Sequence, residues 1–179
     1  NLDAPDDKLY DKYFPDLYNM ELDFDKYGSE NIGDYIRKSY KGGWCYLVKG
    51  KERKQVGKGT TADVNSLYPS MMHSESGNYY PIGVPTFWSG NFIPDEALKK
   101  RRYFFIRIRT RFYIKDGMLP FVQIKGSILY KGTEALTTSD YYDKKTDRYY
   151  KVVRNHWGDK IDTIQTLTLT MTDYYLLIK

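Results

Sequence analysis

The residues with the clearest chemical potential form one continuous string, Thr61-Ala-Asp-Val-Asn-Ser-Leu-Tyr-Pro-Ser-Met-Met72. We expect a strand that ends at Asp63 and a short helix that begins directly after Asn65. The Asp63 carboxylate and the Val64 carbonyl are oxygen ligands that suit Mg²⁺, and the amides at a helix start can bind phosphate oxygens. The string therefore indicates a metal and triphosphate site. A purely structural aspartate between a strand and a capped helix is the alternative.

The flanking sequence predicts the elements that would position this string. Residues 45–48 and 60–64 read as two strands joined by a charged loop, which gives a β-hairpin. Upstream, Ile32, Tyr35 and Ile36 recur at helical spacing, and glycines 42 and 43 would end that helix. In the string itself, Asn65 could cap the helix and Pro69 is compatible with its first turn.

A second feature is a row of arginines within residues 99–115, a block of eight cations and no acid. Over residues 103–114 we expect a strand, whose alternation places Arg107, Arg109 and Arg111 on one face and apolar side chains on the other. Such a row is typical of a surface that binds a polyanion. Acids on a partner protein or on a neighbouring strand of the same domain could also neutralise it.

The remaining patterns complete a mixed fold. Asp116-Gly117 is a hairpin signal leading into a strand over residues 118–124. Leu167, Leu169 and Met171 alternate with threonines, which predicts another half-buried strand, and Thr172 or Asp173 could cap a final helix. The fold class expected from these elements is α+β.

Composition narrows the class of protein. The chain has 41% hydrophobic residues and a net charge of +5, so a folded core is expected. One cysteine excludes a disulfide framework, and the histidines are too far apart for ordinary zinc-ligand spacing. Without an apolar run of about 18 residues or a signal peptide we expect a cytoplasmic protein with no membrane partner. Because the sequence starts with Asn1, we expect a piece of a longer protein.

Three segments resemble family B DNA polymerases. Asp63-Val-Asn-Ser-Leu-Tyr-Pro-Ser70 resembles their motif A, and Tyr40-Lys-Gly-Gly43 resembles their Tyr-x-Gly-Gly motif. Residues 106–133, with Gln123-Ile-Lys and Tyr130-Lys-Gly, are similar to the first terminal-protein-region insertion of the protein-primed subgroup of phages and linear plasmids. This resemblance implies that residues 1–28, which read as an acidic linker or irregular segment, follow an exonuclease module. It also implies a partial palm over 29–76, built from a β-hairpin and short helices, and an inserted mixed α/β subdomain over 77–179.

The resemblance also implies roles for single residues. Asp63 would be a catalytic carboxylate that binds metal, and Val64 would offer its carbonyl to the same metal. Tyr68 would lie under the sugar of the incoming nucleotide and exclude a 2′-hydroxyl. Ser66 would lie near phosphate and Leu67 in the core of the helix. Template DNA would be bound by Tyr40, Gly42 and Gly43, and DNA or the priming protein by Arg107, Arg109 and Arg111.

The implied parent is a DNA-directed DNA polymerase that uses two Mg²⁺ ions, a primer-template, deoxynucleoside triphosphates and a terminal protein as the first primer. The sequence lacks the Tyr-x-Asp-Thr-Asp string that would bring the second catalytic aspartate, and it lacks a fingers helix with its lysine. Two-metal phosphoryl transfer requires both carboxylates, so we expect these 179 residues to be inactive alone. The alternatives are a non-catalytic nucleic-acid-binding module that uses the cationic strand and a protein-docking domain.

Overall fold

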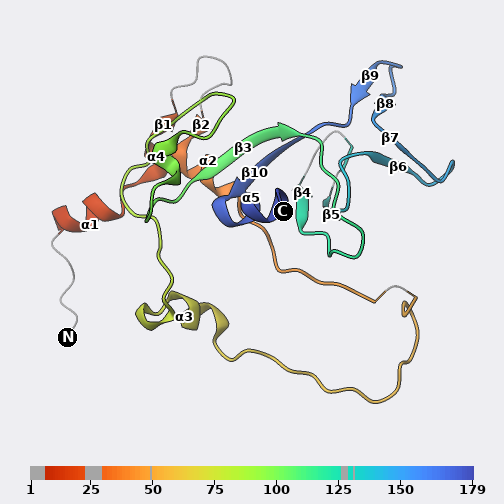
Figure 1. The fold of residues 1–179 in the computed structure, drawn as a ribbon, viewed down its shortest axis with the longest axis horizontal. Coiled ribbons are helices and arrows are strands. Elements are labelled where there is room, and N and C mark those ends of the chain that lie inside the picture. The colour runs from red at the N-terminus through yellow and green to blue at the C-terminus, as the bar shows by residue number, and fades with distance from the viewer. Residues whose placement is uncertain (1–6, 23–29, 49, 126–128, 131) are drawn as a thin grey trace. The chain divides into compact units, whose positions relative to one another are not determined.

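The fold is given by a computed structural model that describes residues 7–22, 30–48, 50–125, 129–130 and 132–179 (Figure 1). The chain divides into two compact units, the first made of residues 1–15 and 43–102 and the second of residues 16–42 and 103–179. This division does not follow the predicted boundaries at residues 28 and 76. The reason is that residues 30–42 are tied by side-chain contacts to residues after 103. Assignment of the segments to a linker, a palm and an insertion remains a prediction.

The second unit is centred on two long antiparallel strands, β3 (Phe105–Thr110) and β10 (Gln165–Thr170). Their register pairs Ile108 with Leu167, and Leu167 is only 2% exposed. This confirms the predicted alternation, although β3 ends four residues before Ile114. The core contains six buried side chains, all in this unit: Phe112, Val122, Ile124, Tyr130, Leu167 and Leu169.

A second ladder joins β4 (Val122–Lys125) to β5 (Thr133–Leu136). The Asp116-Gly117 turn forms as expected, with Gly117 at φ +80°. The strand that follows does not return onto the arginine strand: β3 pairs with β10, and β4 pairs with β5. The predicted pairing of these two neighbouring strands is therefore wrong.

Residues 141–162 form two small hairpins, which no specific sequence pattern predicted. The first pairs β6 (Tyr141–Asp143) with β7 (Arg148–Tyr150), and the second pairs β8 (Val152–Arg154) with β9 (Lys160–Asp162). Local turn chemistry closes both: the Asp143 carboxylate accepts from the Lys145 amide at 2.9 Å, and Gly158 has φ +88°. Both hairpins are short, so their periodicity in the sequence is weak.

Two helices complete the second unit, together with the short pair β1 (Glu21–Leu22) and β2 (Glu30–Asn31). The predicted helix around Tyr35 is α2 (Ile32–Arg37), which ends before Gly42. The last helix, α5 (Met171–Leu177), is capped by Thr170 and not by Thr172 or Asp173. The Thr170 hydroxyl accepts from the Asp173 amide at 3.2 Å, because the strand delivers Thr170 in the extended conformation that a cap needs.

The first unit contains three short helices: α1 (Asp7–Tyr13), α3 (Leu67–Met72) and α4 (Asp95–Leu98). Helix α1 corrects the expectation that residues 1–28 are irregular. Over the described residues 43–66 there is no strand, so the predicted hairpin of residues 45–48 and 60–64 is wrong. Val48 and Val64 are 70% and 59% exposed, and a hairpin without a buried face is only marginally stable.

Candidate nucleotide and nucleic-acid interface

The motif-A string lies in the first unit and continues directly into α3. Ser66, not Asn65, is the residue before the helix, and it adopts a left-handed conformation with φ 51° and no side-chain cap. Pro69 is the third residue of α3 and fits the first turn as expected. Tyr68 is 72% exposed on the same turn, so its ring is available to a ligand.

The other end of α3 is held by the segment that follows it. The Tyr80 hydroxyl donates to the Met71 carbonyl at 2.6 Å, and the Asn78 side-chain amide donates to the same oxygen at 3.0 Å. These two bonds satisfy a carbonyl that the helix end leaves free. They fix the orientation of a helix that is only six residues long.

Asp63 and Val64 provide one carboxylate and one backbone carbonyl, both exposed, in the extended segment before Ser66. Both are hard oxygen donors that suit Mg²⁺, so the donor chemistry fits the expected ion. Within the described part of the chain, no group of three or more His, Cys, Asp or Glu side chains is close enough together to hold a metal. These residues can therefore contribute ligands but cannot complete a metal site.

The Tyr40-Lys-Gly segment lies in the second unit and contacts β4. The Gly42 amide donates to Gln123 Oε1 at 3.1 Å, and Gln123 Nε2 donates to the Gly42 carbonyl at 3.5 Å. Lys125 Nζ donates to the Tyr40 carbonyl at 2.9 Å and lies 5.1 Å from the Tyr40 ring centroid. The Tyr40 ring is nevertheless 62% exposed.

The Lys41 side chain is partly buried, unlike that of an ordinary surface lysine. Its Nζ lies 3.5 Å from the Gln123 carbonyl oxygen, and its burial lowers the pKa of the ammonium group below the ordinary value. The carboxylate of Asp173 opposes this shift, and the charge of Lys125 adds to it. Lys41 therefore adds a further contact between this segment and β4.

Arg107 has partners inside the second unit. Its guanidinium forms a two-pronged ion pair with Glu30, at 2.8 and 3.2 Å, and lies 4.3 Å from the ring centroid of Tyr35. Arg107 Nε also donates to Thr168 Oγ1 at 3.2 Å. The hydrogen bonds from Arg107 hold the pKa of the Glu30 carboxyl below its usual value.

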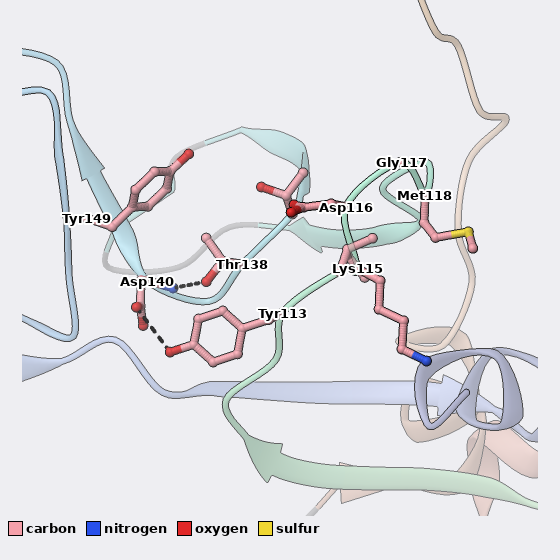
Figure 2. Close-up of a pocket in the computed structure, with 10 residues that line it drawn as sticks. Tyr113, Lys115, Asp116, Gly117, Met118, Thr138, Asp140 and Tyr149 are labelled. Atoms are coloured by element: carbon pink, nitrogen blue, oxygen red, sulfur yellow. Dashed lines mark hydrogen bonds between the residues drawn. The ribbon is translucent and has the colours of Figure 1, made fainter.

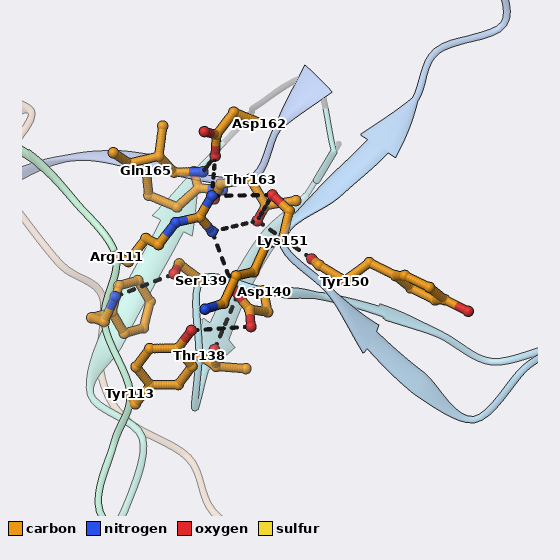
Figure 3. A network of polar contacts seen from close by, with 12 residues as sticks. Arg111, Tyr113, Thr138, Ser139, Asp140, Tyr150, Lys151, Asp162, Thr163 and Gln165 are labelled. Atoms are coloured by element: carbon orange, nitrogen blue, oxygen red, sulfur yellow. Dashed lines mark hydrogen bonds and ion pairs between the residues drawn. The ribbon is translucent and has the colours of Figure 1, made fainter. Parts of the chain in front are cut away.

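Arg111 is the centre of a polar network that connects β3 to both hairpins (Figure 3). Its guanidinium binds Asp140 Oδ1 at 3.3 Å, Thr163 Oγ1 at 3.1 Å and the Lys151 carbonyl at 3.2 Å, and it also pairs with Asp162. Thr163 is fully buried, so the network closes the base of the hairpins. Two of the three arginines are thus neutralised within the domain, which is one of the alternatives that the sequence left open.

Arg109 differs from its two neighbours. It is exposed on β3, opposite Thr166 of β10, and across the residues that the structure describes it forms no ion pair or hydrogen bond. Arg109 is therefore the member of the predicted row whose charge faces solvent.

An open pocket of about 420 Å³ lies beside the network (Figure 2). The Tyr113 hydroxyl donates to Asp140 Oδ2 at 3.1 Å on one wall, and the wall facing it carries the turn at Gly117. The pocket mixes polar and apolar side chains, and its buried carboxylate, Asp140, is already bonded to Tyr113 and Arg111, so the pocket defines no ligand class.

Comparison with known proteins places this chain in a polymerase family. A family model described as DNA polymerase type B, organellar and viral, matches residues 11–173, and the chain belongs to this family. The family predicted from the sequence is confirmed. Across the described residues, no helix is long and apolar enough to cross a bilayer.

The similar proteins are DNA polymerases of phages. Those of Bacillus phage Nf and Bacillus phage phi29 are 37% and 36% identical over 132 residues, which are 74% of this chain and 20% of each relative. That of Streptococcus phage Cp-1 is 34% identical over 117 residues. The chain thus spans about one fifth of the length of these relatives.

A solved structure supports the fold. Phi29 DNA polymerase complexed with primer-template DNA and incoming nucleotide substrates matches 96% of this chain with a TM-score of 0.62 and 28% identity, over 23% of its own length. The α+β class, with short helices and small sheets, is confirmed by this match.

Sequence reasoning did not find the residues that hold the predicted site segments. It named Gln123 and Lys125 only as part of a family resemblance, and it did not expect Asp140 or Thr163 to bind Arg111. These contacts join residues from 29 to 85 positions apart. Gln123 does carry a signal, because a polar residue between Val122 and Ile124 stands in a buried strand.

Proposed function

We propose that this chain functions as part of a DNA-directed DNA polymerase that transfers deoxynucleotides in protein-primed replication. The observation that carries the proposal is the motif-A string at the start of α3, in a chain that belongs to the type B polymerase family. The phi29 polymerase structure, a complex with primer-template DNA and incoming nucleotides, supports the same ligands here. The terminal protein as first primer rests on the resemblance of residues 106–133, and the place of action would be the host cytoplasm.

Asp63 and Val64 are the proposed ligands of a catalytic Mg²⁺ ion. Their exposed oxygens suit this cation, and the bound ion would stabilise the charge that develops on the transferred phosphate. A second carboxylate must come from elsewhere in the polymerase, since the sequence lacks the Tyr-x-Asp-Thr-Asp string that would bring it.

The first turn of α3 is the proposed nucleotide-binding element. Tyr68 would support the deoxyribose and exclude a ribose hydroxyl, because an aromatic ring fills the space that this hydroxyl needs. Ser66 would lie near the triphosphate, whereas Leu67, expected in the core of the helix, is 46% exposed in the structure. The 72% exposure of Tyr68 supports this role, since the ring is not committed to the core of its unit.

DNA contact is proposed for Tyr40, Gly42, Gly43 and Arg109. An exposed ring and two glycines suit base stacking and close approach of a phosphate. For Arg107 and Arg111 the carboxylate partners favour a structural role, so the proposed contribution of the row to DNA or terminal-protein binding falls mainly on Arg109. This weakens the alternative of a nucleic-acid-binding module built on the cationic strand.

The test of this function is Asp63→Asn in the complete polymerase that carries these residues. We expect templated incorporation with Mg²⁺ to fall on the order of a thousandfold, because loss of a metal ligand removes several kcal/mol of transition-state stabilisation. Primer-template affinity should change little. The control is Asp95→Asn, which removes an exposed carboxylate of the first unit at α4. Unchanged incorporation by Asp63→Asn would refute the catalytic role.

The 179-residue chain gives a complementary test. Purified alone, it should incorporate no nucleotide, because its sequence contains Asp63 without the Tyr-x-Asp-Thr-Asp string that would bring the second catalytic carboxylate. Templated extension by the isolated chain that disappears with Asp63→Ala would show that the site is complete within it.

A further inference from the structure

We infer that Gln123 of β4 is a positioning residue for the Tyr40-Lys-Gly segment and sets how this segment meets single-stranded template DNA. This inference rests on the proposed function, since it takes template DNA to be the ligand of Tyr40 and Gly42. It assigns a role in DNA binding to a residue that itself would not touch DNA.

The first observation is the two-way pairing between a side-chain amide and a backbone peptide. Gln123 accepts from the Gly42 amide at 3.1 Å and approaches the Gly42 carbonyl with its own Nε2 at 3.5 Å. Gln123 is only 8% exposed, and a buried amide is costly unless it is hydrogen-bonded. The Gln123 side chain and the Gly42 peptide therefore hold one another in place.

The second observation is that the support is rigid. On either side of Gln123, Val122 and Ile124 are 1% and 6% exposed and belong to the core. Lys125, the next residue on β4, binds the Tyr40 carbonyl at 2.9 Å. Strand β4 thus forms hydrogen bonds to the backbone at both Tyr40 and Gly42, while the Tyr40 ring stays 62% exposed.

The third observation concerns the glycine itself. Gly42 does not have a positive φ, and a Cβ atom built on it would meet no described atom within 4 Å. The fold of the described residues therefore requires neither its backbone freedom nor its lack of a side chain. The Gly42 peptide is held in place by Gln123 and has open space where a side chain would stand. A ligand backbone can therefore approach it closely.

Together these features point to a nucleic-acid strand as the ligand. An exposed aromatic ring can stack on a base of any sequence, and the open peptide at Gly42 can approach the sugar-phosphate backbone. Stacking depends on the position of the ring. Gln123 would fix that position through Gly42, two residues along the chain.

The experiment uses four variants of the complete polymerase and a primer with a single-stranded template overhang. Gln123→Met removes both hydrogen bonds and keeps the volume of the side chain. Gln165→Met is the matched control, because Gln165 is also a buried strand glutamine, 7% exposed, but donates to the Thr163 carbonyl. Tyr40→Ala and the Tyr40→Ala, Gln123→Met double variant complete a double-mutant cycle.

We expect Gln123→Met to raise the Kd for primer-template about tenfold, with the incorporation rate at saturating DNA unchanged. Gln165→Met should lower the melting temperature by a similar amount and leave this Kd unchanged. The double variant should bind no more weakly than Tyr40→Ala, because both changes remove the same contact.

The possible outcomes separate this inference from the proposed function. Weaker binding by Tyr40→Ala with unchanged binding by Gln123→Met would overturn the inference and leave the proposed template contact intact. Fully additive effects would also overturn it, since Gln123 would then act by another route. Unchanged binding by Tyr40→Ala would instead refute the template contact itself.

Discussion

At the scale of single residues, the site string combines an exposed ring at Tyr68 with a left-handed backbone at Ser66. A left-handed serine costs about 1 kcal/mol relative to an ordinary conformation, so the turn between Val64 and α3 is strained. Strain of this kind persists where a precise local geometry is needed. Here it sets the direction in which α3 leaves the metal-ligand segment.

Tyr68→Val in the complete polymerase should reduce the preference for deoxyribonucleotides over ribonucleotides by about tenfold to a hundredfold, because it removes the ring proposed to block a 2′-hydroxyl. The measurement is the ratio of kcat/KM for matched deoxy and ribo substrates. Tyr79→Val is the control, since Tyr79 is 81% exposed in the same unit. An unaltered ratio for Tyr68→Val would remove Tyr68 from this role.

Arg109→Ala in the complete polymerase should weaken DNA or terminal-protein binding and leave the melting temperature nearly unchanged, because Arg109 is exposed. If Arg109 contacts phosphate, the slope of log K against log salt should fall by about one. Arg111→Ala should behave oppositely: it removes the guanidinium from the buried Asp140 carboxylate, and a lost partner at a buried acceptor costs about 1–3 kcal/mol. A lower melting temperature with intact binding in Arg109→Ala would contradict this assignment.

At the scale of elements, sequence patterns predicted those strands whose burial follows from local alternation along the chain. Alternation correctly identified β3 and β10, because one face of each is buried in the core. Capping residues and strand partners were harder to predict from the sequence. Thr170, Thr172 and Asp173 are all good capping residues, and only the end of β10 decides among them. The hairpin expected before motif A was wrong because its valines have no buried face within their unit.

Thr170→Val tests the cap of α5. Removing the hydroxyl that accepts from the Asp173 amide should lower the free energy of unfolding by about 0.5–2 kcal/mol. The control is Thr166→Val, an exposed position on the same strand, where a β-branched replacement should be nearly neutral. Denaturant unfolding measures both. Equal stability of the two variants would contradict the capping role.

At the scale of the whole molecule, the sequence indicated the family and the site segments, while contacts between distant segments stayed hidden. The ion pair between Arg107 and Glu30 joins residues that are 77 positions apart. The sequence around either residue does not predict this partner. The arginine row therefore looked like a continuous binding surface, although folding neutralises two of its three charges.

The Glu30 pair predicts how stability responds to acid. Because Arg107 and Lys38 lower the pKa of Glu30 in the folded chain, its contribution is present above the ordinary value of 4.5 and is lost as the pH falls through the lowered value. The melting temperature of Glu30→Gln should thus lie below that of the parent near neutral pH, and the difference should shrink toward about pH 3. A constant difference across this range would show that the pair contributes nothing through charge.

The pairing of β3 with β10 also determines the order in which the second unit can fold. It closes a loop over residues 111–164, and the entropic cost of closure rises with loop length. Hairpins β6–β7 and β8–β9 lie inside this loop and form from local contacts, so they can shorten it before it closes. Amide hydrogens of the hairpins should therefore exchange through small local openings, whereas those of Leu167 and Leu169 should exchange only when the whole unit unfolds.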